Sequence, residues 1–322
     1  MNGAEANEKI LVTGGTGFLG GYVLDRLVAD KLIAGQSSDG SVPPTVLSRA
    51  PSHAFLDKYQ DKISLLEIDL LDDKALEKLF EDFQPDRIIH LAGSADKSGN
   101  RAGELEKLNY GATVKLLELA LKARVKRIVI TGTADEYGSQ AAPQSETLPP
   151  KPASEYALSK NRAVRHALSL YEKHRLPIVV LRPFTIYGIG QPPSMFVAQA
   201  VECAVKNLPF EMSEGFQKRD LLFVEDLADV MIKALTAENI EGEIFNAGSG
   251  EAFALRDVAQ KIWNIAGADL GQLKIGARHT NRNELHDTQA DITKVSDALG
   301  WKPKISLDEG LKIIIENAKA RV

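Results

Sequence analysis

The sequence has few of the residues that build metal centres and disulfides. Cys203 is its only cysteine, which excludes an internal disulfide and a cysteine-based zinc site. The six histidines stand at no spacing typical of a metal centre. Long apolar runs that would span a bilayer are also missing, and the polar, acidic start MNGAEANEK differs from a signal peptide. We therefore expect a cytoplasmic protein that holds no metal.

An excess of positive charge is missing too. The 322 residues carry a formal net charge of -5, which argues against nucleic acid or an anionic membrane as the partner. The composition, 44% hydrophobic and 26% charged, is that of a globular protein. The length suffices for one large α/β domain and a smaller one that shares its core.

Short apolar runs alternate with amphipathic stretches through the first half of the chain. Buried parallel strands are predicted for the runs KILVT, TVLS, ISLLEI, RIIHLAG and RIVITGT, followed later by LPIVVLRP and GEIFNAGS. Helical spacing of apolar residues falls between them, at 19–29, 74–83 and 105–122, with a further helix at 225–235. This alternation predicts an α/β protein with a Rossmann-type, doubly wound parallel sheet covered on both faces.

The regular pattern loosens from about residue 183 onward. We expect residues 1–183 to form a dinucleotide-binding Rossmann domain. Residues 184–322 should form mainly a smaller α/β substrate-binding domain, interleaved with the last strands of the sheet. The stretch 35–44, rich in Gly, Ser and Pro, reads as a surface loop at the end of the sheet away from the ligand crevice.

Three glycines follow the first predicted strand and open the first helix. Gly14, Gly17 and Gly20 would let backbone N–H groups and a helix N-terminus approach a pyrophosphate, although their spacing is three-three and the common fingerprint is two-three. The second strand ends in Ser48 and Arg49, with no carboxylate for the ribose hydroxyls of NAD. Ser48 leaves room and Arg49 offers a guanidinium for a 2′-phosphate, so the sequence favours NADP and leaves NAD open.

Tyr156 and Lys160 stand four residues apart in SEYALSK, on one face of a predicted helix. An ammonium beside a phenol favours the phenolate, so we expect Lys160 to pull the pKa of Tyr156 below its usual value of about 10. That pair predicts a tyrosine that works as a general acid or base near neutral pH.

Eight motifs occur in the order seen in extended short-chain dehydrogenases/reductases. They are GGTGFLG, the Asp69-Leu70 pair, HLAG, ITGTADEYG, YALSK, LRPFTIYG, KRDLLFVEDLADV and LGWKPKISLDEGL. Over nearly its whole length the chain resembles the nucleotide-sugar epimerase/dehydratase/reductase branch of that family.

The resemblance implies a catalytic triad of Thr133, Tyr156 and Lys160. Tyr156 would exchange a proton with a sugar hydroxyl or keto oxygen, Thr133 would hydrogen-bond the same oxygen, and Lys160 would hold the nicotinamide ribose. The positions assigned to the cofactor are Gly14, Thr16, Gly17, Phe18, Leu19, Gly20, Ser48, Arg49, Asp69, Leu70, Leu91, Ala92, Gly93 and Lys160. For Asp69, a hydrogen bond from adenine and an ordinary helix cap are both open.

The positions assigned to a nucleotide-diphosphate sugar are Asn109, Asp135, Thr185, Arg219 and Arg282. Asn109 is equally consistent with a surface position. Arg219 is the expected partner of the diphosphate, and whether Arg278 or Arg282 joins it stays open. The resemblance also implies a homodimer, formed through the helices at 105–122 and 155–173.

Two departures from the family pattern bear on the reaction. Dehydratases of the family place an adjacent Asp and Glu directly after the threonine, whereas here Ala134 takes the first place and Asp135 the second. A shift by one residue changes the direction in which side chains face, which disfavours dehydration. The form GTADEYG is more similar to enzymes that reduce 4-keto-6-deoxy nucleotide sugars. Thr185 stands where the family usually has Asn.

Three functions remain open from the sequence. The first is a reductase that uses NADPH to reduce a keto group at carbon 4 of a nucleotide-activated sugar. The second is a 4-epimerase, which oxidises and re-reduces the same carbon with a tightly bound NAD. The third is a non-catalytic NADP-binding regulator, against which the presence of Thr133, Tyr156 and Lys160 argues.

Overall fold

The computed structural model describes residues 8–29, 42–49, 51–95, 102–279 and 287–321. Contacts divide the chain into two units, which are described separately. Unit 1 consists of Met1–Glu136, Pro152–Arg182 and Ala228–Phe245. Unit 2 consists of Tyr137–Lys151, Pro183–Leu227 and Asn246–Val322. Each unit is therefore assembled from three segments of the chain.

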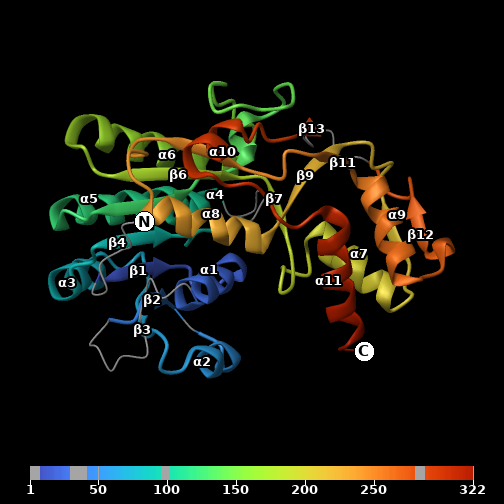
Figure 1. The fold of residues 1–322 in the computed structure, drawn as a ribbon, viewed down its shortest axis with the longest axis horizontal. Coiled ribbons are helices and arrows are strands. Elements are labelled where there is room, and N and C mark those ends of the chain that lie inside the picture. Colours follow the sequence, from blue (N-terminus) through green and yellow to red (C-terminus); the bar gives the residue numbers. More distant parts are fainter. Residues whose placement is uncertain (1–7, 30–41, 50, 96–101, 280–286, 322) are drawn as a thin grey trace. The chain divides into compact units, whose positions relative to one another are not determined.

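A seven-stranded sheet with the order β10-β6-β5-β4-β1-β2-β3 is the centre of unit 1 (Figure 1). Its strands are β1 (Ile10–Thr13), β2 (Thr45–Ser48), β3 (Ser64–Glu67), β4 (Arg87–His90), β5 (Arg127–Thr131), β6 (Ile178–Pro183) and β10 (Ile244–Ala247). All five pairings from β3 across to β6 are parallel. The order 3-2-1-4-5-6 is that of the dinucleotide-binding Rossmann fold, which confirms the predicted fold class.

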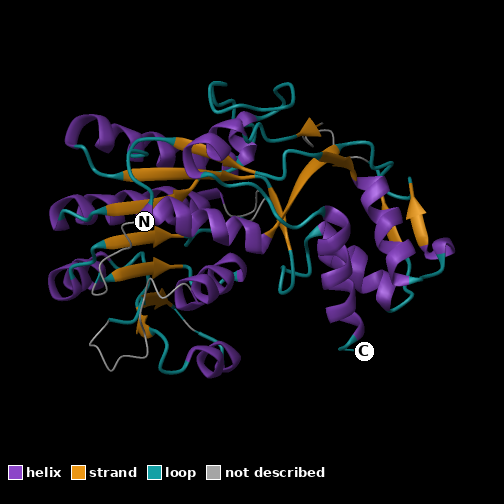
Figure 2. Cartoon of the chain, in the orientation of Figure 1, coloured by secondary structure: helices purple, strands orange, loops and turns teal. Residues whose placement is uncertain are grey.

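Helices alternate with these strands, as the apolar spacing predicts (Figure 2). The elements are α1 (Phe18–Ala29), α2 (His53–Tyr59), α3 (Asp73–Phe83), α4 (Ala102–Leu105), the π-helix η1 (Glu106–Ala112), α5 (Thr113–Ala123), the 3-10 turn η2 (Ala134–Tyr137), α6 (Glu155–His174) and α8 (Val224–Thr236). Helix α3 begins where Asp72 accepts hydrogen bonds from the backbone N–H groups of Lys74 and Ala75.

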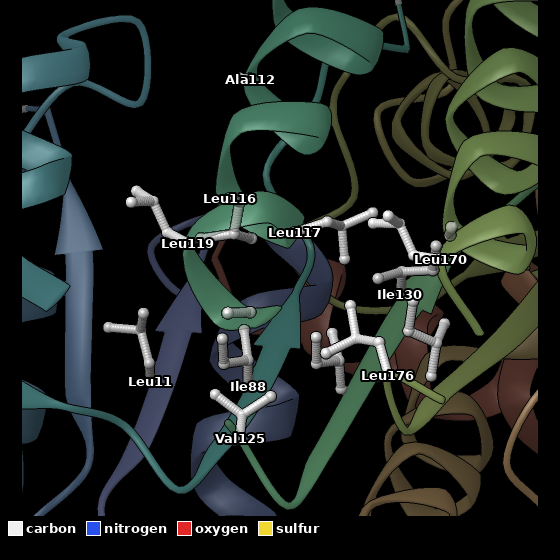
Figure 3. Close-up of a cluster of buried hydrophobic side chains, with 14 of the residues drawn as sticks. Leu11, Ile88, Ala112, Leu116, Leu117, Leu119, Val125, Ile130, Leu170 and Leu176 are labelled. Atoms are coloured by element: carbon white, nitrogen blue, oxygen red, sulfur yellow. The ribbon is translucent and has the colours of Figure 1, made fainter. Parts of the chain in front are cut away.

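The main core of unit 1 lies between the sheet and helices α3, α5 and α6, which contact one another in that order. Leu11, Ile88 and Ile130 point from the strands toward Leu116 and Leu117 of α5 (Figure 3). The strands are apolar on both faces because helices cover both. Helices α1 and α8 are joined by an ion pair between Arg26 Nε and Asp229 Oδ1, 2.6 Å apart.

One expected helix differs from the prediction. The stretch 105–122 is not a uniform α-helix, because its first part is the π-helix η1 around Asn109. The Thr113 hydroxyl donates a hydrogen bond to the Asn109 carbonyl oxygen at 2.8 Å, inside this wider turn. A π turn within a helix is frequent at functional sites, and hydrophobic spacing does not reveal it.

The described part of unit 2 holds short strands and helices, of which α7, α9 and α11 carry its core. The elements are β7 (Thr185–Tyr187), α7 (Phe196–Val205), β8 (Phe210–Met212), β9 (Lys218–Phe223), β11 (Ala252–Ala254), α9 (Leu255–Ala266), η3 (Leu270–Gln272), β12 (Leu273–Ile275), β13 (Asp287–Thr288), α10 (Thr293–Leu299) and α11 (Leu307–Lys319). Strand β9 pairs with β11, β13 and β7. Helices α7, α9 and α11 pack together around Trp263.

Most of the loop expected at 35–44 lies outside the described residues. Within the described part of the chain, none of the helices has the length and apolar character needed to cross a membrane.

Candidate functional site

The turn between β1 and α1 is built so tightly that two of its positions accept only glycine. Gly14 has φ +71°, and a Cβ there would lie 2.6 Å from the backbone nitrogen of Ala92 in the loop after β4. A Cβ on Gly20 would lie 2.2 Å from the carbonyl oxygen of Gly14. Helix α1 therefore starts directly against the end of β1. Its first-turn N–H groups are available to an anion, as in a site for a dinucleotide pyrophosphate.

The end of β2 lies next to this turn. Thr16 Oγ1 and Ser48 Oγ are 3.2 Å apart, and Ser48 is buried. Arg49 follows with an exposed side chain. After β3, Asp69 Oδ1 accepts a hydrogen bond from the Leu71 N–H at 3.0 Å. Asp69 thus fixes the turn before α3, while the cap of that helix is Asp72.

The three residues of the expected triad come together at the end of β5. Helix α6 begins after Ser154, whose side chain accepts from the Ala157 N–H, and it carries Tyr156 and Lys160 one turn apart. The Thr133 side chain, just past β5, is hydrogen-bonded to the Tyr156 hydroxyl. Lys160 Nζ donates to Thr131 Oγ1 at 3.1 Å. One end of one strand therefore positions the whole set.

The protonation of this set differs from the sequence expectation. The pKa of Tyr156 is raised to about 12, by burial first and then by the negative charges of Asp135 and Glu136, against an opposing hydrogen bond from Thr133. The expectation that the pKa of Tyr156 lies below its usual value is therefore wrong. Burial lowers the pKa of Lys160 itself to about 8. Tyr156 therefore carries its proton at neutral pH and is set up as a proton donor.

Asn109 is buried and joins the loop after β4 to helix α6, so it is not a surface residue. Its Oδ1 accepts from the Ser94 N–H at 2.8 Å. Its Nδ2 donates to the Ser94 carbonyl oxygen and to Ser159 Oγ, at 3.0 and 3.1 Å. Because Ser159 directly precedes Lys160, this amide fixes the helix turn that carries the lysine. A Cβ on Gly93 would lie 2.9 Å from Asn109 Oδ1, which explains the glycine there.

His90 is buried at the end of β4 with both ring nitrogens hydrogen-bonded. Thr113 donates its hydroxyl hydrogen to the Asn109 carbonyl, so at His90 it must accept from Nε2–H, at 2.9 Å. Nδ1 is then the acceptor of the Thr13 hydroxyl, at 2.7 Å. The pKa of His90 is lowered to about 3, by burial first and then by the charge of Lys160. His90 is a neutral link between β1, β4 and α5.

Sequence reasoning assigned no role to Glu136, which follows the predicted substrate residue Asp135. Asp135 is half-buried, and its charge acts on Tyr156. Glu136 is fully buried and is paired with Arg182 at the end of β6. The signal in the sequence was the acidic residue displaced by one place from the dehydratase pattern. Its burial depends on an arginine 46 positions away, which a linear motif does not show.

The remaining predicted substrate residues belong to unit 2. Thr185 is exposed on β7, where it pairs in register with Leu221 of β9. Arg219 is half-buried on β9, and its NH1 donates to the Lys218 carbonyl oxygen at 2.8 Å. Arg278 is exposed, with its Nε 3.8 Å from Glu211 Oε2. Arg282 lies outside the described residues.

Comparisons with known proteins agree on one family. The profile described as the NAD dependent epimerase/dehydratase family matches residues 10–248. The chain is 28% identical to the UDP-glucuronate 4-epimerase of Thermodesulfobacterium geofontis, over 97% of this chain and 96% of that one. It is 26% identical to the dTDP-D-glucose 4,6-dehydratase of Mus musculus, over 96% and 88%.

Solved structures agree with the sequence comparisons. The UDP-glucuronic acid 4-epimerase of Bacillus cereus, in complex with UDP-glucuronic acid and NAD, superposes with a TM-score of 0.86. It is 25% identical, and the match covers 98% of this chain and all of that one.

Proposed function

This chain belongs to the NAD-dependent epimerase/dehydratase family, and we propose that it is a reductase of a nucleotide-activated 4-keto sugar, 6-deoxy in form. The observation that carries the proposal is the placement of the Tyr156 hydroxyl, which is hydrogen-bonded to Thr133 at the end of β5 and stands one helical turn before Lys160. Reduction of a ketone to an alcohol needs one hydride and one proton. A tyrosine that keeps its proton at neutral pH supplies the proton.

The turn at Gly14 and Gly20 fits a dinucleotide cofactor, because its missing side chains leave the backbone open to a pyrophosphate. A bound nicotinamide supplies the hydride. We assign Lys160 to its ribose hydroxyls. The absence of a carboxylate after β2 and the exposed guanidinium of Arg49 support NADP. NAD is the alternative, as in the complex of the Bacillus cereus relative.

In the proposed reaction, Tyr156 Oη gives its proton to the keto oxygen while Thr133 Oγ1 hydrogen-bonds the same atom. Asp135 and Asn109 are proposed to contact or position the sugar. Thr185 and Arg219, with Arg282 or Arg278, are proposed to contact the sugar and the diphosphate. A homodimer, a cytoplasmic location and a substrate-binding role for residues 184–322 complete the proposal.

Two other reactions of the family use the same triad. A 4-epimerase is the first alternative, favoured by the 4-epimerases among the relatives. Dehydration needs an additional acid and base beside the threonine. Here Ala134 has no acidic side chain, and the Glu136 carboxylate is fully buried in an ion pair with Arg182. That engagement argues against Glu136 as the base for water loss.

The cofactor claim is tested by mass spectrometry of the supernatant after denaturation of freshly purified protein, together with titrations of NADPH and NADH. An empty protein that prefers NADPH supports the reductase, whereas retained NAD supports the epimerase. Arg49→Gln should weaken NADPH binding about tenfold or more, the value of a charge-assisted hydrogen bond, and leave NADH binding unchanged. Lys62→Gln, an exposed lysine of the same unit, is the control. Equal losses for both cofactors would refute the role of Arg49.

The catalytic claim is tested with Tyr156→Phe, which removes only the hydroxyl group that donates the proton. We expect NADPH-dependent reduction of a 4-keto-6-deoxy nucleotide sugar to be lost, with NADPH affinity retained. A Tyr156→Phe enzyme that still reduces the keto sugar would refute the mechanism.

A further inference from the structure

One carboxylate beneath the triad touches both of the elements that carry it. Glu136 has no exposed surface. Its Oε1 accepts from the Thr133 backbone N–H at 2.8 Å, and its Oε2 accepts from Asn161 Nδ2 at 3.1 Å. Thr133 is the catalytic residue after β5, and Asn161 directly follows Lys160 on α6. The two oxygens of Glu136 therefore join the threonine to the helix turn of the lysine.

The charge of this carboxylate is balanced inside the protein. Arg182, with 2% of its surface exposed, donates from NH2 to Glu136 Oε2 at 2.9 Å. The pair is packed so closely on the end of β5 that Gly132 has no room for a side chain. A Cβ there would lie 2.4 Å from Glu136 Oε1 and 3.1 Å from Arg182 Cγ. A fully buried ion pair is costly to maintain, so its position under the triad calls for a functional reason.

We propose that Glu136, paired with Arg182, is a positioning residue that holds the Thr133 amide and the Asn161 side chain, so that Thr133, Tyr156 and Lys160 keep a fixed geometry. This inference rests on the proposed function, because it concerns the same proton transfer. Glu136 does not touch the reacting atoms. It acts through the threonine and through helix α6.

The charge of Glu136 has a second effect on the same groups. Tyr156 faces the carboxylates of Asp135 and Glu136, and Lys160 faces Glu136 and His90. The negative charge of Glu136 raises the pKa of both Tyr156 and Lys160. Glu136→Gln removes this negative charge and keeps the arginine, so it should lower the pKa of Tyr156 and of Lys160.

The test uses two variants. Glu136→Gln tests the effect of the charge, and Glu136→Leu combined with Arg182→Met tests the positioning role without leaving a buried arginine that has lost its carboxylate. The full-length protein is labelled with carbon-13 in the tyrosine ring, and the Tyr156 signal is assigned by comparison with Tyr156→Phe. In Glu136→Gln we expect the titration midpoint of Tyr156 to fall, because one of the charges that raise its pKa is gone. In the double variant we expect kcat for NADPH-dependent reduction of a 4-keto-6-deoxy nucleotide sugar to fall about tenfold, with NADPH affinity within about twofold of wild type.

The control is Glu241→Gln, which disturbs another ion pair of unit 1 at the opposite end of the same strand. Glu241 is paired with the buried Arg127, the first residue of β5. This variant should lose stability while keeping both the Tyr156 midpoint and kcat. A folded Glu136→Leu, Arg182→Met protein with wild-type kcat, or a folded Glu136→Gln protein with the wild-type Tyr156 midpoint, would overturn the proposal.

The two proposals fail in different ways. If wild-type protein reduces no keto sugar, the proposed function is refuted while the Tyr156 midpoint still decides the role of Glu136. Conversely, if the wild type is active but the Tyr156 titration midpoint is the same in wild type and Glu136→Gln, only the role of Glu136 is refuted.

Discussion

Replacing Lys160 by Met should make the protein more stable at neutral pH while abolishing turnover. Lys160 is 8% exposed, and burial lowers its pKa from 10.5 to about 8. At 1.36 kcal/mol for each pH unit, this shift corresponds to about 3 kcal/mol lost by the folded state when the ammonium is charged. Met has a similar length and no charge. It forfeits the hydrogen bond to Thr131 Oγ1, worth about 1 kcal/mol, which leaves a net gain of about 2 kcal/mol.

The gain depends on pH in a direction that follows from the lowered pKa. Below about pH 8, Lys160 is protonated in both the folded and the unfolded chain, and the whole cost is present. Between about pH 8 and 10.5 the folded side chain loses its proton first, so the stability of the wild type rises. Near pH 10.5 the cost has gone, and Lys160→Met should be less stable than wild type by about 1 kcal/mol.

The assay is urea unfolding followed by circular dichroism at pH 7 and at pH 10, with wild type and variant compared at each pH. Lys173→Met, on an exposed lysine in the last turn of the same helix, is the control and should show no pH-dependent difference. A Lys160→Met protein that is less stable than wild type at pH 7, or a difference that stays constant with pH, would refute the reasoning.

Two further predictions concern the residues around the glycine turn. His90 should stay neutral from about pH 8 down to pH 5, with its proton on Nε2, because burial lowers its pKa to about 3. Nitrogen-15 NMR measures this, and titration of the ring in that pH range would contradict the hydrogen bonds to Thr13 and Thr113. The contribution of His90 to stability is present above its unfolded pKa and is lost as the pH falls toward the folded value. Gly20→Ala should lower NADPH affinity about tenfold or more, because its Cβ would lie 2.2 Å from the Gly14 carbonyl oxygen. Fluorescence titration with NADPH measures the affinity, and Gly103→Ala, where a Cβ would have nothing within 4 Å, is the control. Equal NADPH affinities of the two variants would contradict the account.

Much of unit 1 was predictable because parallel strands buried on both faces appear as short continuous apolar runs. That signal placed β1, β4 and β5, and the motif spacing brought Thr133, Tyr156 and Lys160 to one point. The protonation states were not predictable. The pKa of Lys160 depends on how many atoms from other elements exclude water from its ammonium, and linear spacing contains no such count.

The same limit applies to the residues that support the site. The π-helix around Asn109 keeps the apolar spacing of an α-helix, so periodicity does not distinguish the two. The ion pair between Glu136 and Arg182 joins the residues after β5 to the end of β6, and the whole of helix α6 lies between the two partners in the sequence. In the sequence Glu136 looks like a displaced dehydratase residue, and only the fold shows that its carboxylate points into the protein.

The central claim is the transfer of a hydride from NADPH to carbon 4 of a nucleotide sugar. The direct measurement uses NADPH with deuterium in place of both hydrogens at nicotinamide carbon 4 and a 4-keto-6-deoxy nucleotide sugar, followed by mass spectrometry and NMR of the product. The account predicts one deuterium at carbon 4 of the product for each NADPH oxidised, and none with Tyr156→Phe. A 4-keto sugar that gains no deuterium, together with a 4-hydroxy nucleotide sugar that is epimerised without NADPH consumption, would contradict it.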